Sequence, residues 1–400
     1  MLQRIHRPSP QPPAMIRMFP QSNARTRFQM LALLILAAAL LLAALPARAQ
    51  QLDKPLQNID EDITAFAYGP DGRIVYAVNR GFKTKQYDLE HDDIWIQDAG
   101  GKRRRIFIGE KFLRGNTPFT YTANSFRWSP NGRLILAELF TASIDETGKT
   151  QDSSMTLVLE DNEKEARGGG NENVIQDSLD ASWLQDNSTV IYLTPVVQPR
   201  VLFSFHFINR GGGPSGAVFE GRTFLDSVPV PGSNVAIAVE RDRSLTGPPR
   251  LQRLELLAQD DREIATLDGY EGGLSLSPSG NKIAYYIDKE VLEIRSLTDL
   301  TRSTRVRIGL GVFHWAPDET RIFLKRSIEK KSGDLVWIDI PPLAAQASSS
   351  KEPPPVIQPT PISIFHGLTF RDFVISPDGR FLAVIAVGRR NLSVFPLPGR

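Results

Sequence analysis

The sequence Trp128-Ser-Pro-Asn-Gly-Arg-Leu-Ile-Leu-Ala137 combines a tight turn with a run of β-forming residues. Proline presets φ for the first central position of a turn, and Asn-Gly supplies residues that tolerate a left-handed backbone. The apolar run after the turn does not alternate with polar residues, as it would in a sheet with one solvated face. The stretch therefore predicts two antiparallel strands joined by a turn, in a sheet covered on both faces.

The same phrase recurs along the chain at a mean spacing of about fifty residues, which indicates a repeat architecture. It consists of an apolar residue, Ser-Pro-Asp-Gly or a variant, a basic residue and a β-forming run. The clear copies begin at Phe66, Phe126, Leu274, Phe313 and Phe373, and degenerate copies begin at Ala181 and Val228.

Each copy is followed by further strand candidates, such as Asp93–Gln97 and Arg104–Ile108 after the first copy. Four strands per copy, packed face to face with neighbouring sheets, are typical of β-propeller blades. The sequence therefore predicts an all-β protein, a β-propeller of about seven four-stranded antiparallel blades over residues 51–400.

The two ends of the repeat region predict how the propeller closes. The last copy contains its inner strands and Leu392–Phe395 but lacks an outermost strand, whereas Leu52–Ile59 is a spare strand candidate before the first copy. We expect this N-terminal strand to complete the last blade, which removes an exposed sheet edge. The Pro-rich segment 341–361 is expected to be a solvated loop of the sixth blade.

The first fifty residues have the pattern of a secretory signal peptide. They contain six arginines and no acidic residue, then an apolar run from Met30 to Leu45, then Ala47-Arg-Ala49. A basic head, an apolar centre and an Ala-x-Ala end are what a signal peptidase recognises. The alternative is an uncleaved membrane anchor, although the run is shorter than the roughly 20 residues that span a bilayer.

Charge and cysteine content exclude several classes of function. Without residues 1–50 the chain has 41 basic and 45 acidic residues, a formal net charge of −4, so no excess of positive charge points to a nucleic-acid partner. The chain has no cysteine, which excludes disulfides, thiol nucleophiles and thiolate metal sites.

The phrases at Ser129 and Ser376 resemble the repeat of TolB-like, WD-type propellers, and the likeness covers about residues 56–398. That family includes periplasmic Tol-Pal components, propeller halves of prolyl peptidases and many bacterial proteins without an assigned role. The resemblance implies the propeller fold and says little about function. TolB itself has six blades and an α/β domain before them, whereas this sequence has seven copies that start soon after the signal.

The sequence offers no motif for nucleotide binding or serine hydrolysis. Gly211, Gly213 and Gly216 have G-x-G-x-x-G spacing, but they lie between two strand candidates rather than between a strand and a helix, so we expect a hairpin loop. No G-x-S-x-G nucleophile elbow occurs. We therefore expect no cofactor and no catalytic residue.

Metal-binding and charged clusters have simple alternative interpretations. Glu90–Asp93 could hold an ion, but adjacent side chains on an extended chain point to opposite faces, so a solvated loop is expected. Asp60–Asp62 could bind Ca²⁺, but this loop lacks the alternating ligands and the glycine of an EF-hand. Lys102–Arg105 is interpreted as a solvated edge, with contact to an anionic surface as the alternative. Trp128, Trp183 and Trp315 occupy repeat positions and are expected to pack between blades.

These observations together predict an exported, non-catalytic propeller, periplasmic or secreted, that binds another protein or a peptide as a monomer. The binding residues are not identifiable from the sequence. The alternative is a propeller enzyme, a lyase, lactonase or hydrolase, with a site at the mouth of the central channel. Convergent histidines and carboxylates at that mouth would favour the enzyme.

Overall fold

The chain divides into two units, Met1–Arg48 and Ala49–Arg400, and every residue that the structure describes belongs to the second. The computed structural model describes residues 54–83, 88–112, 118–144, 150–161, 166–167, 174–194, 202–208, 211–212, 216–219, 221–242, 246–267, 269–309, 311–329, 332–345, 354–368, 370–388 and 390–397. The described residues form strands and turns and contain no helix. They thus include no helix that could cross a membrane.

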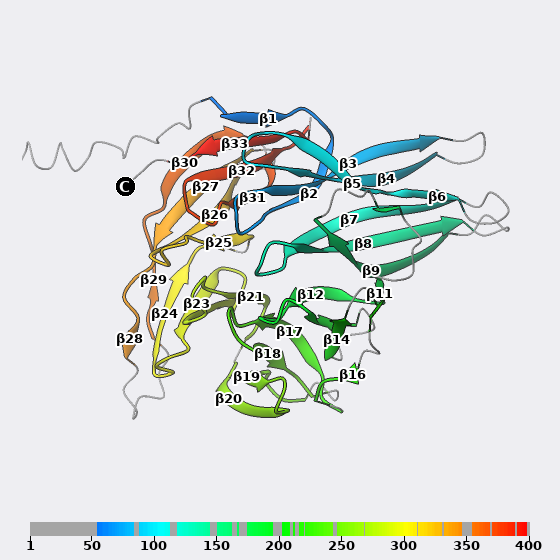
Figure 1. Cartoon of the computed structure of the whole chain (residues 1–400). Coiled ribbons are helices and arrows are strands. Elements are labelled where there is room, and N and C mark those ends of the chain that lie inside the picture. Colours follow the sequence, from blue (N-terminus) through cyan, green and yellow to red (C-terminus); the bar gives the residue numbers. More distant parts are fainter. Residues whose placement is uncertain are drawn as a thin grey trace, which may run out of the picture. The chain divides into compact units, whose positions relative to one another are not determined.

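The strands form seven sheets that follow one another along the chain (Figure 1). The first contains β2 (Ile63–Tyr68), β3 (Ile74–Lys83), β4 (Asp88–Gln97) and β5 (Arg103–Ile108), with β10 (Ala166–Arg167) parallel to β5. The second contains β6 (Glu110–Phe112), β7 (Pro118–Trp128), β8 (Leu134–Ile144), β9 (Thr150–Glu160) and β11 (Val174–Gln176). The third contains β12 (Leu179–Trp183), β13 (Thr189–Leu193), β14 (Leu202–Ile208), β15 (Gly211–Gly212) and β16 (Gly216–Ala217).

The remaining four sheets repeat the same antiparallel order. The fourth contains β17 (Phe224–Pro229), β18 (Val235–Glu240), β19 (Arg250–Glu255) and β20 (Asp260–Thr266). The fifth contains β21 (Gly272–Leu276), β22 (Lys282–Tyr286), β23 (Val291–Ser296), β24 (Arg302–Arg307), β28 (Ala344–Ala345) and β29 (Val356–Ile357). The sixth contains β25 (Phe313–Trp315), β26 (Arg321–Glu329), β27 (Ser332–Asp339) and β30 (Ile362–Leu368), and the seventh contains β31 (Phe370–Ile375), β32 (Phe381–Ala386), β33 (Leu392–Pro396) and β1 (Gln57–Ile59).

Apolar side chains fill the spaces between consecutive sheets, which is the packing of a β-propeller. Each buried cluster joins two sheets that are neighbours in the chain. One further cluster packs the first sheet, through Ile63 and Tyr76, against the seventh, through Ile385 and Leu392. Strands such as β18, which is buried along its whole length, are apolar on both faces because both faces meet a neighbouring sheet.

The pairing expected of the N-terminal segment is present for Gln57–Ile59, which pairs antiparallel with Leu392–Val394. The Leu56 amide donates a hydrogen bond to the Val394 carbonyl at 2.8 Å. Ile59 is 2 % exposed, and the Arg390 guanidinium pairs with Asp62 beside the strand. The first described residues of the chain are therefore held on the last sheet.

The repeated Ser-Pro-Asp-Gly phrase is a hydrogen-bonded turn. In the seventh sheet the Ser376 hydroxyl donates to Asp378 at 2.6 Å and accepts from the Phe381 amide at 2.9 Å, while the Arg380 amide donates to the Asp378 carboxylate at 3.0 Å. Gly379 has a φ of 71°, a left-handed conformation that glycine adopts without strain. Ser129 and Asn131 form the same contacts in the second sheet, so the local chemistry of the phrase explains its recurrence.

Bulges interrupt several of the strands near the start of a sheet. Carboxylates of the preceding sheet accept hydrogen bonds from backbone amides of these bulged strands. Asp92 accepts from the Ala123 amide at 2.7 Å, Glu138 from the Asp180 amide at 3.0 Å, and Asp226 from the Leu274 amide at 3.3 Å. A bulge leaves an amide out of the strand ladder, and a buried donor needs an acceptor. These carboxylates therefore bind one sheet to the next.

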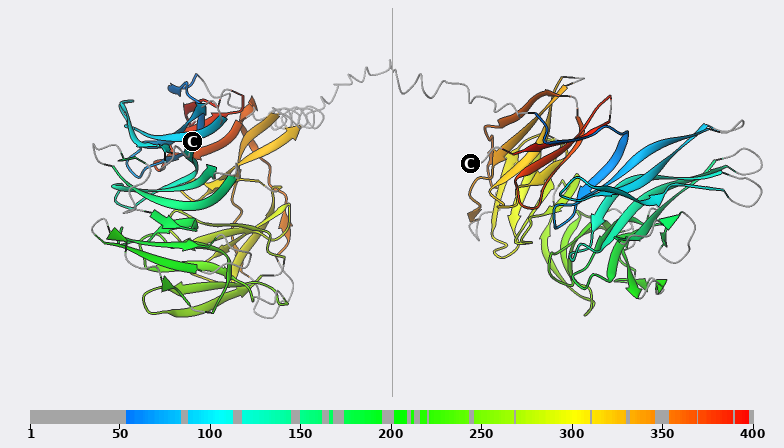
Figure 2. Two further views of the ribbon diagram at one scale, coloured as in Figure 1. Left: turned by 90° about the vertical axis from the view of Figure 1, so that its right-hand side faces the viewer. Right: turned by 45° about the horizontal axis from the view of Figure 1, so that its top comes forward.

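The pairing corrects one expectation about loops. The segment 341–361 is not entirely a solvated loop, because β28 and β29 lie within it and both pair with β24 of the fifth sheet. The hairpins β3–β4 and β8–β9 are long and project beyond neighbouring strands (Figure 2). Their strands pair as far as Lys83 with Asp88 and Ile144 with Thr150.

Candidate binding site

The turns of the repeated phrase contact one another from sheet to sheet. A Cβ built on Gly132 would lie 3.2 Å from Pro70 of the preceding turn, and one on Gly280 would lie 3.2 Å from Pro231. Gly379 lies equally close to the proline of its preceding turn. Between the fifth and sixth sheets, a hydrogen bond from the Ser279 amide to Glu319 replaces this contact.

The contact is missing where the seventh sheet meets the first, as it also is at Gly232 of the fourth sheet. A Cβ on Gly72 would have no atom within 4 Å, so the turn at Pro377 does not pack on it. A cavity of about 460 Å³ opens between the two turns, and we call it the seam cavity. This volume lies within the range of about 300 to 1,000 Å³ that is usual for ligand sites.

Both ends of the described chain contribute to the seam cavity. Its apolar lining comes from Leu56 before β1, Tyr68 of β2, Ile74 of β3, Phe381 of β32 and Val394 of β33. Its acidic lining comes from the turn residues Asp71, Asp98 and Asp378. The cavity is therefore mostly apolar with a few charged groups, which is the usual composition of a binding site.

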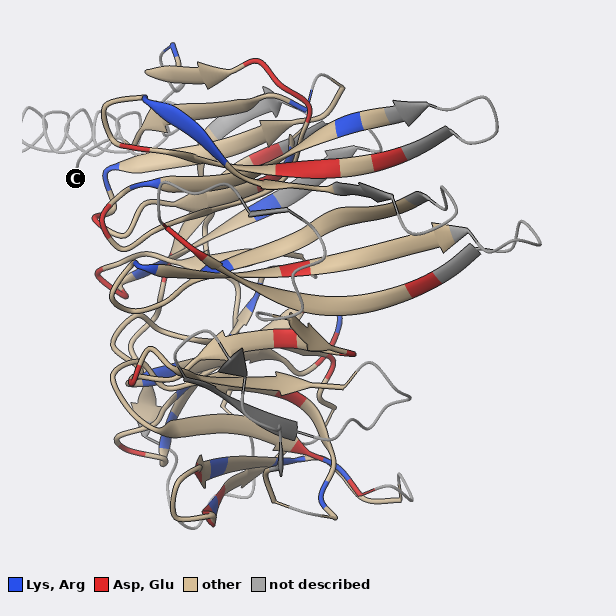
Figure 3. Ribbon diagram, turned by 45° about the vertical axis from the view of Figure 1, so that its right-hand side comes forward, with Lys and Arg blue, Asp and Glu red and all other residues tan. Residues whose placement is uncertain are grey.

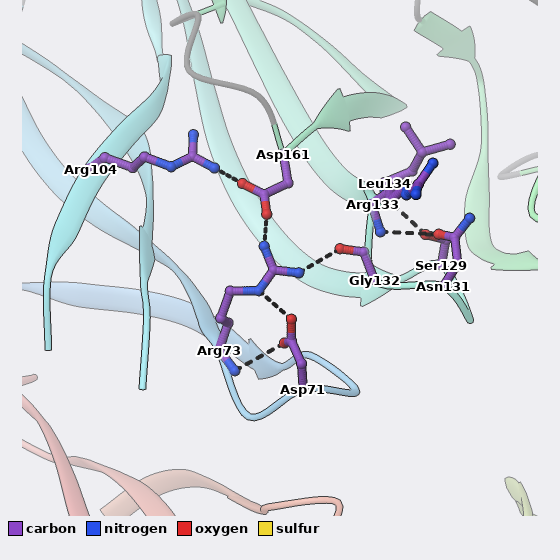
Figure 4. A network of polar contacts seen from close by, with 9 residues as sticks. All are labelled: Asp71, Arg73, Arg104, Ser129, Asn131, Gly132, Arg133, Leu134 and Asp161. Carbon is purple, nitrogen blue, oxygen red and sulfur yellow. Dashed lines mark hydrogen bonds and ion pairs between the residues drawn. The ribbon is translucent and has the colours of Figure 1, made fainter. Parts of the chain in front are cut away.

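Arg73 fixes the position of Asp71 (Figure 4). Its guanidinium pairs with the Asp71 carboxylate at 2.6 Å, donates to the Gly132 carbonyl at 2.7 Å and pairs with Asp161. Arg104 pairs with the same Asp161, and the Arg73 guanidinium lies 4.8 Å from the centre of the Trp128 ring. This network joins the first two sheets and neutralises Asp71.

Asp378 is also paired, whereas Asp98 is not. The Arg380 guanidinium lies 2.6 Å from the Asp378 carboxylate. Burial is the largest single effect on the pKa of Asp378 and raises it, but the hydrogen bonds from Ser376 and Arg380 together with the charge of Arg380 outweigh burial, so the pKa is lowered. Asp98 accepts a hydrogen bond from the Lys102 amide at 2.8 Å but makes no ion pair with another described residue. Asp98 is thus the uncompensated charge of the seam cavity.

Tyr68 adds an unsatisfied polar group to the cavity wall. Its hydroxyl is buried and has no hydrogen-bond partner among the residues that the structure describes. Burial, with the nearby charge of Asp378, raises the pKa of Tyr68 far above its ordinary value, so the phenol stays neutral. The wall therefore contains a neutral donor that no acceptor in the described part of the chain satisfies.

A second cavity of about 240 Å³ lies on the other side of the Ser376–Arg380 turn. Phe323, Trp337 and Arg321 of the sixth sheet line it, and it shares Asp378 and Arg380 with the seam cavity. The Arg321 guanidinium lies 4.6 Å from the centre of the Trp337 ring. Two mainly apolar hollows therefore flank one turn.

Glu90–Asp93, interpreted as a solvated loop, instead lies within β4, and His91, Asp92 and Asp93 are buried. Asp93 pairs with Arg105 at 3.0 Å and accepts from the Gly109 amide, while Asp92 accepts from Thr64 at 2.8 Å. These acids satisfy structural donors. Within the described ranges, no group of three or more histidines and acids is arranged to hold a metal.

The basic run Lys102–Arg105 is only partly a solvated edge. Arg103, Arg104 and Arg105 lie on β5 and pair with Glu61, Asp161 and Asp93, respectively. In the view of Figure 3, basic residues are spread over several sheets and interspersed with acidic ones. This distribution differs from the clustered basic face of a nucleic-acid-binding protein.

The glycine-rich segment lies among strands, but its described glycines belong to short strands rather than to the expected hairpin loop. Gly211 belongs to β15 and Gly216 to β16, and both short strands pair with β14; Gly213 lies outside the described residues. Trp183 and Trp315 are buried in clusters between sheets, as their repeat positions predicted.

Asp226 is expected to make stability depend on pH. Burial raises the pKa of its carboxyl to about 6, against the hydrogen bond from Tyr270 and with a further contribution from the charge of Asp180. Because the folded-state pKa lies above the ordinary value, folding favours the neutral form, and this contribution is lost as the pH rises through 6. The free energy of unfolding should lose about 2 kcal/mol from this group between pH 4.5 and pH 7.5.

Urea unfolding of the native protein and of Asp226→Asn at these two pH values measures the effect. Asparagine keeps an acceptor for Tyr270 and Leu274 without titrating, so the stability difference between the two proteins should change with pH. A constant difference would show that Asp226 is ionised throughout.

The seam cavity was not identifiable from the sequence because its wall comes from opposite ends of the chain. The turn phrases around Asp71 and Asp378 are visible in the sequence, but as fold signals that are shared by the other copies. Leu56 lies within the predicted closing strand Leu52–Ile59, and only the structure shows that its side chain is exposed beside the cavity.

Comparisons with known proteins give fold-level similarity only. No protein-family model matches the chain, and no curated protein matches it. Similar solved structures include the β-propeller domain of Cps50 (Swd1) from Myceliophteria thermophila, with a TM-score of 0.49 and 10 % identity over 86 % of this chain and 99 % of that one. They also include the C-terminal WD40 domain of Sif2, with a TM-score of 0.43 and 12 % identity over 87 % and 99 % of the two chains.

A third similar structure is TolB from Acinetobacter baumannii, with a TM-score of 0.38 and 10 % identity over 80 % of this chain and 79 % of that one. Identity and TM-score are low in all three cases. The assignment of a β-propeller fold therefore depends on the strand pairing and on the buried clusters between the sheets.

Proposed function

We propose that the mature protein is an exported, monomeric and non-catalytic propeller of the TolB-like repeat type, which binds another protein in the periplasm or outside the cell. In this proposal residues 1–50 are a cleaved signal peptide. The seven sheets are the blades of one ring, and β1 closes it on the last blade.

The seam cavity is the observation that supports a binding role. It lies where the turn-to-turn contact is missing, and it is mostly apolar with one uncompensated carboxylate. The carboxylates at the bulges, by contrast, are engaged by backbone amides of the next sheet. Groups that are already occupied in this way favour a structural role over a catalytic one.

Site-specific photocrosslinking in the bacterium that makes the protein tests this function. A photoreactive benzoylphenylalanine at Leu56, which is 60 % exposed and lines the seam cavity, should give a discrete protein adduct. The matched control is the same residue at Leu257, which is 77 % exposed and lies in the fourth sheet's β19–β20 turn. Equal adducts at the two positions, or none at Leu56, would contradict binding at this site.

The signal peptide is tested by determining the N-terminus of the exported protein. Cleavage after Ala47-Arg-Ala49 predicts a mature chain that starts at Gln50 or Gln51. N-terminal sequencing of protein from the periplasm or the medium gives the start directly. A mature chain that still begins at Met1 or Met18 would support the membrane-anchor alternative instead.

A further inference from the structure

We propose that the seam cavity binds an extended peptide segment of the partner, with an apolar side chain in the cavity and a Lys or Arg two residues away, on the same side of the peptide, paired with Asp98. This inference rests on the proposed protein-binding function and specifies the chemistry that the site recognises.

The charges around the cavity select a basic residue. Arg73 neutralises Asp71 and Arg380 neutralises Asp378, each at 2.6 Å, whereas Asp98 makes no ion pair with another described residue. The five charged groups together carry one net negative charge. A ligand that brings a cation to Asp98 completes the pairing, and complementary charge of this kind selects partners.

The cavity wall selects an apolar side chain. Ile74, Val394 and the rings of Tyr68 and Phe381 line it, and Leu56 is largely exposed beside it. Covering such surface is favourable by about 25 cal/mol for each Å² of apolar area removed from water. A polar ligand would leave this surface without a matching contact.

The neighbouring hollow favours an extended peptide over a compact small molecule. The second cavity lies directly across the Ser376–Arg380 turn and has its own aromatic wall in Phe323 and Trp337. A chain that fills the seam cavity and continues over the turn reaches this second apolar surface. Extended peptides use alternate side chains in this way, because successive side chains point to opposite sides of the backbone.

Selection from a random heptapeptide library displayed on phage, with the full mature protein as target, tests the inference. Enriched peptides should contain an apolar residue and, two positions away, a Lys or Arg. Two synthetic peptides with the enriched sequence, one with the basic residue changed to Gln and one with the apolar residue changed to Ala, should each bind more weakly in fluorescence polarisation.

Two pairs of variants assign the binding to the cavity. Asp98→Asn should weaken binding of the basic peptide about fivefold and leave binding of its Gln version unchanged. Asp260→Asn, on the exposed strand β20, should change the binding of neither peptide. Leu56→Asn should weaken binding of the peptide about fivefold, whereas Leu257→Asn should leave its binding unchanged. All four substitutions involve partly or fully exposed side chains, so folding is expected to persist, and circular dichroism checks it.

The outcomes separate the inference from the function. The inference is overturned if the enriched peptides bind the Asp98→Asn and Leu56→Asn variants as tightly as the native protein. It is also overturned if the enriched peptides lack the apolar and basic pair. In both cases the proposed protein-binding function still stands. Failure to enrich any peptide, together with the absence of an adduct at Leu56, overturns both.

Discussion

A chain that begins at Asp62 is expected to be less stable and less soluble than one that begins at Gln51. The truncation removes β1, whose residues pair with Leu392–Val394, and it removes Ile59 from the cluster between the first and seventh sheets. Burial of one isoleucine is worth about 1.5 to 3 kcal/mol, and the lost strand ladder adds to this. Thermal melting and the soluble yield after expression measure the two effects.

A chain that begins at Leu56 is the matched control, because it keeps β1 and should melt with the longer chain. Equal melting temperatures for the chains that begin at Asp62 and Gln51 would contradict the proposed closing role of β1. A second test uses the absence of cysteine from the chain. Asn58 and Ser393 are directly opposed and their side chains are 3.0 Å apart, so Asn58→Cys with Ser393→Cys should form a disulfide that raises the melting temperature.

Glu293→Gln is expected to destabilise the protein far more than the loss of a surface ion pair. Glu293 is 1 % exposed and lies in the middle of the fifth sheet. Its carboxylate accepts from Tyr285 at 3.0 Å and pairs with Arg295 at 2.6 Å and Arg305 at 2.9 Å. Removing the charge leaves two guanidiniums without their anion, which costs about 3 to 5 kcal/mol in comparable buried pairs.

Glu290→Gln provides the comparison in the same sheet. Glu290 pairs with Arg307 at 2.6 Å, but the two side chains are 60 % and 50 % exposed. Glu290→Gln should therefore lower the free energy of unfolding by less than about 1 kcal/mol. Guanidinium chloride unfolding of the two variants and the native protein gives both values. Similar losses for both variants would show that the buried cluster contributes no more than a surface pair.

The buried network around Glu293 also shows the limit of sequence patterns. Leu292-Glu-Ile-Arg295 has the composition of a strand, but nothing in its spacing indicates that two of its charges are buried together. Glu293 is opposite Tyr285 on one side and Arg305 on the other. These two partners come from two other strand candidates, and the sequence does not predict their registers.

The sequence by itself determined the fold class, the position of the turns and the strand that pairs with the end of the chain. Each Ser-Pro-Asp-Gly turn is stabilised by contacts among residues at most five positions apart, such as Ser376 with Phe381, so the information is local. The spare strand at Gln57–Ile59 follows from counting strands within each repeat. Local propensity and repeat number need no knowledge of distant contacts.

Only the tertiary structure decided where a ligand can bind. The turns at Asp71 and Asp378 have the same local chemistry as other copies, yet the contact that Gly132, Gly280 and Gly379 make with the preceding turn is missing between them, as it also is at Gly232. The burial of His91–Asp93 and the pairing of 341–361 with β24 likewise depend on neighbouring strands. Packing between sheets joins residues more than 300 positions apart, and no pattern within one repeat encodes how closely two such repeats approach.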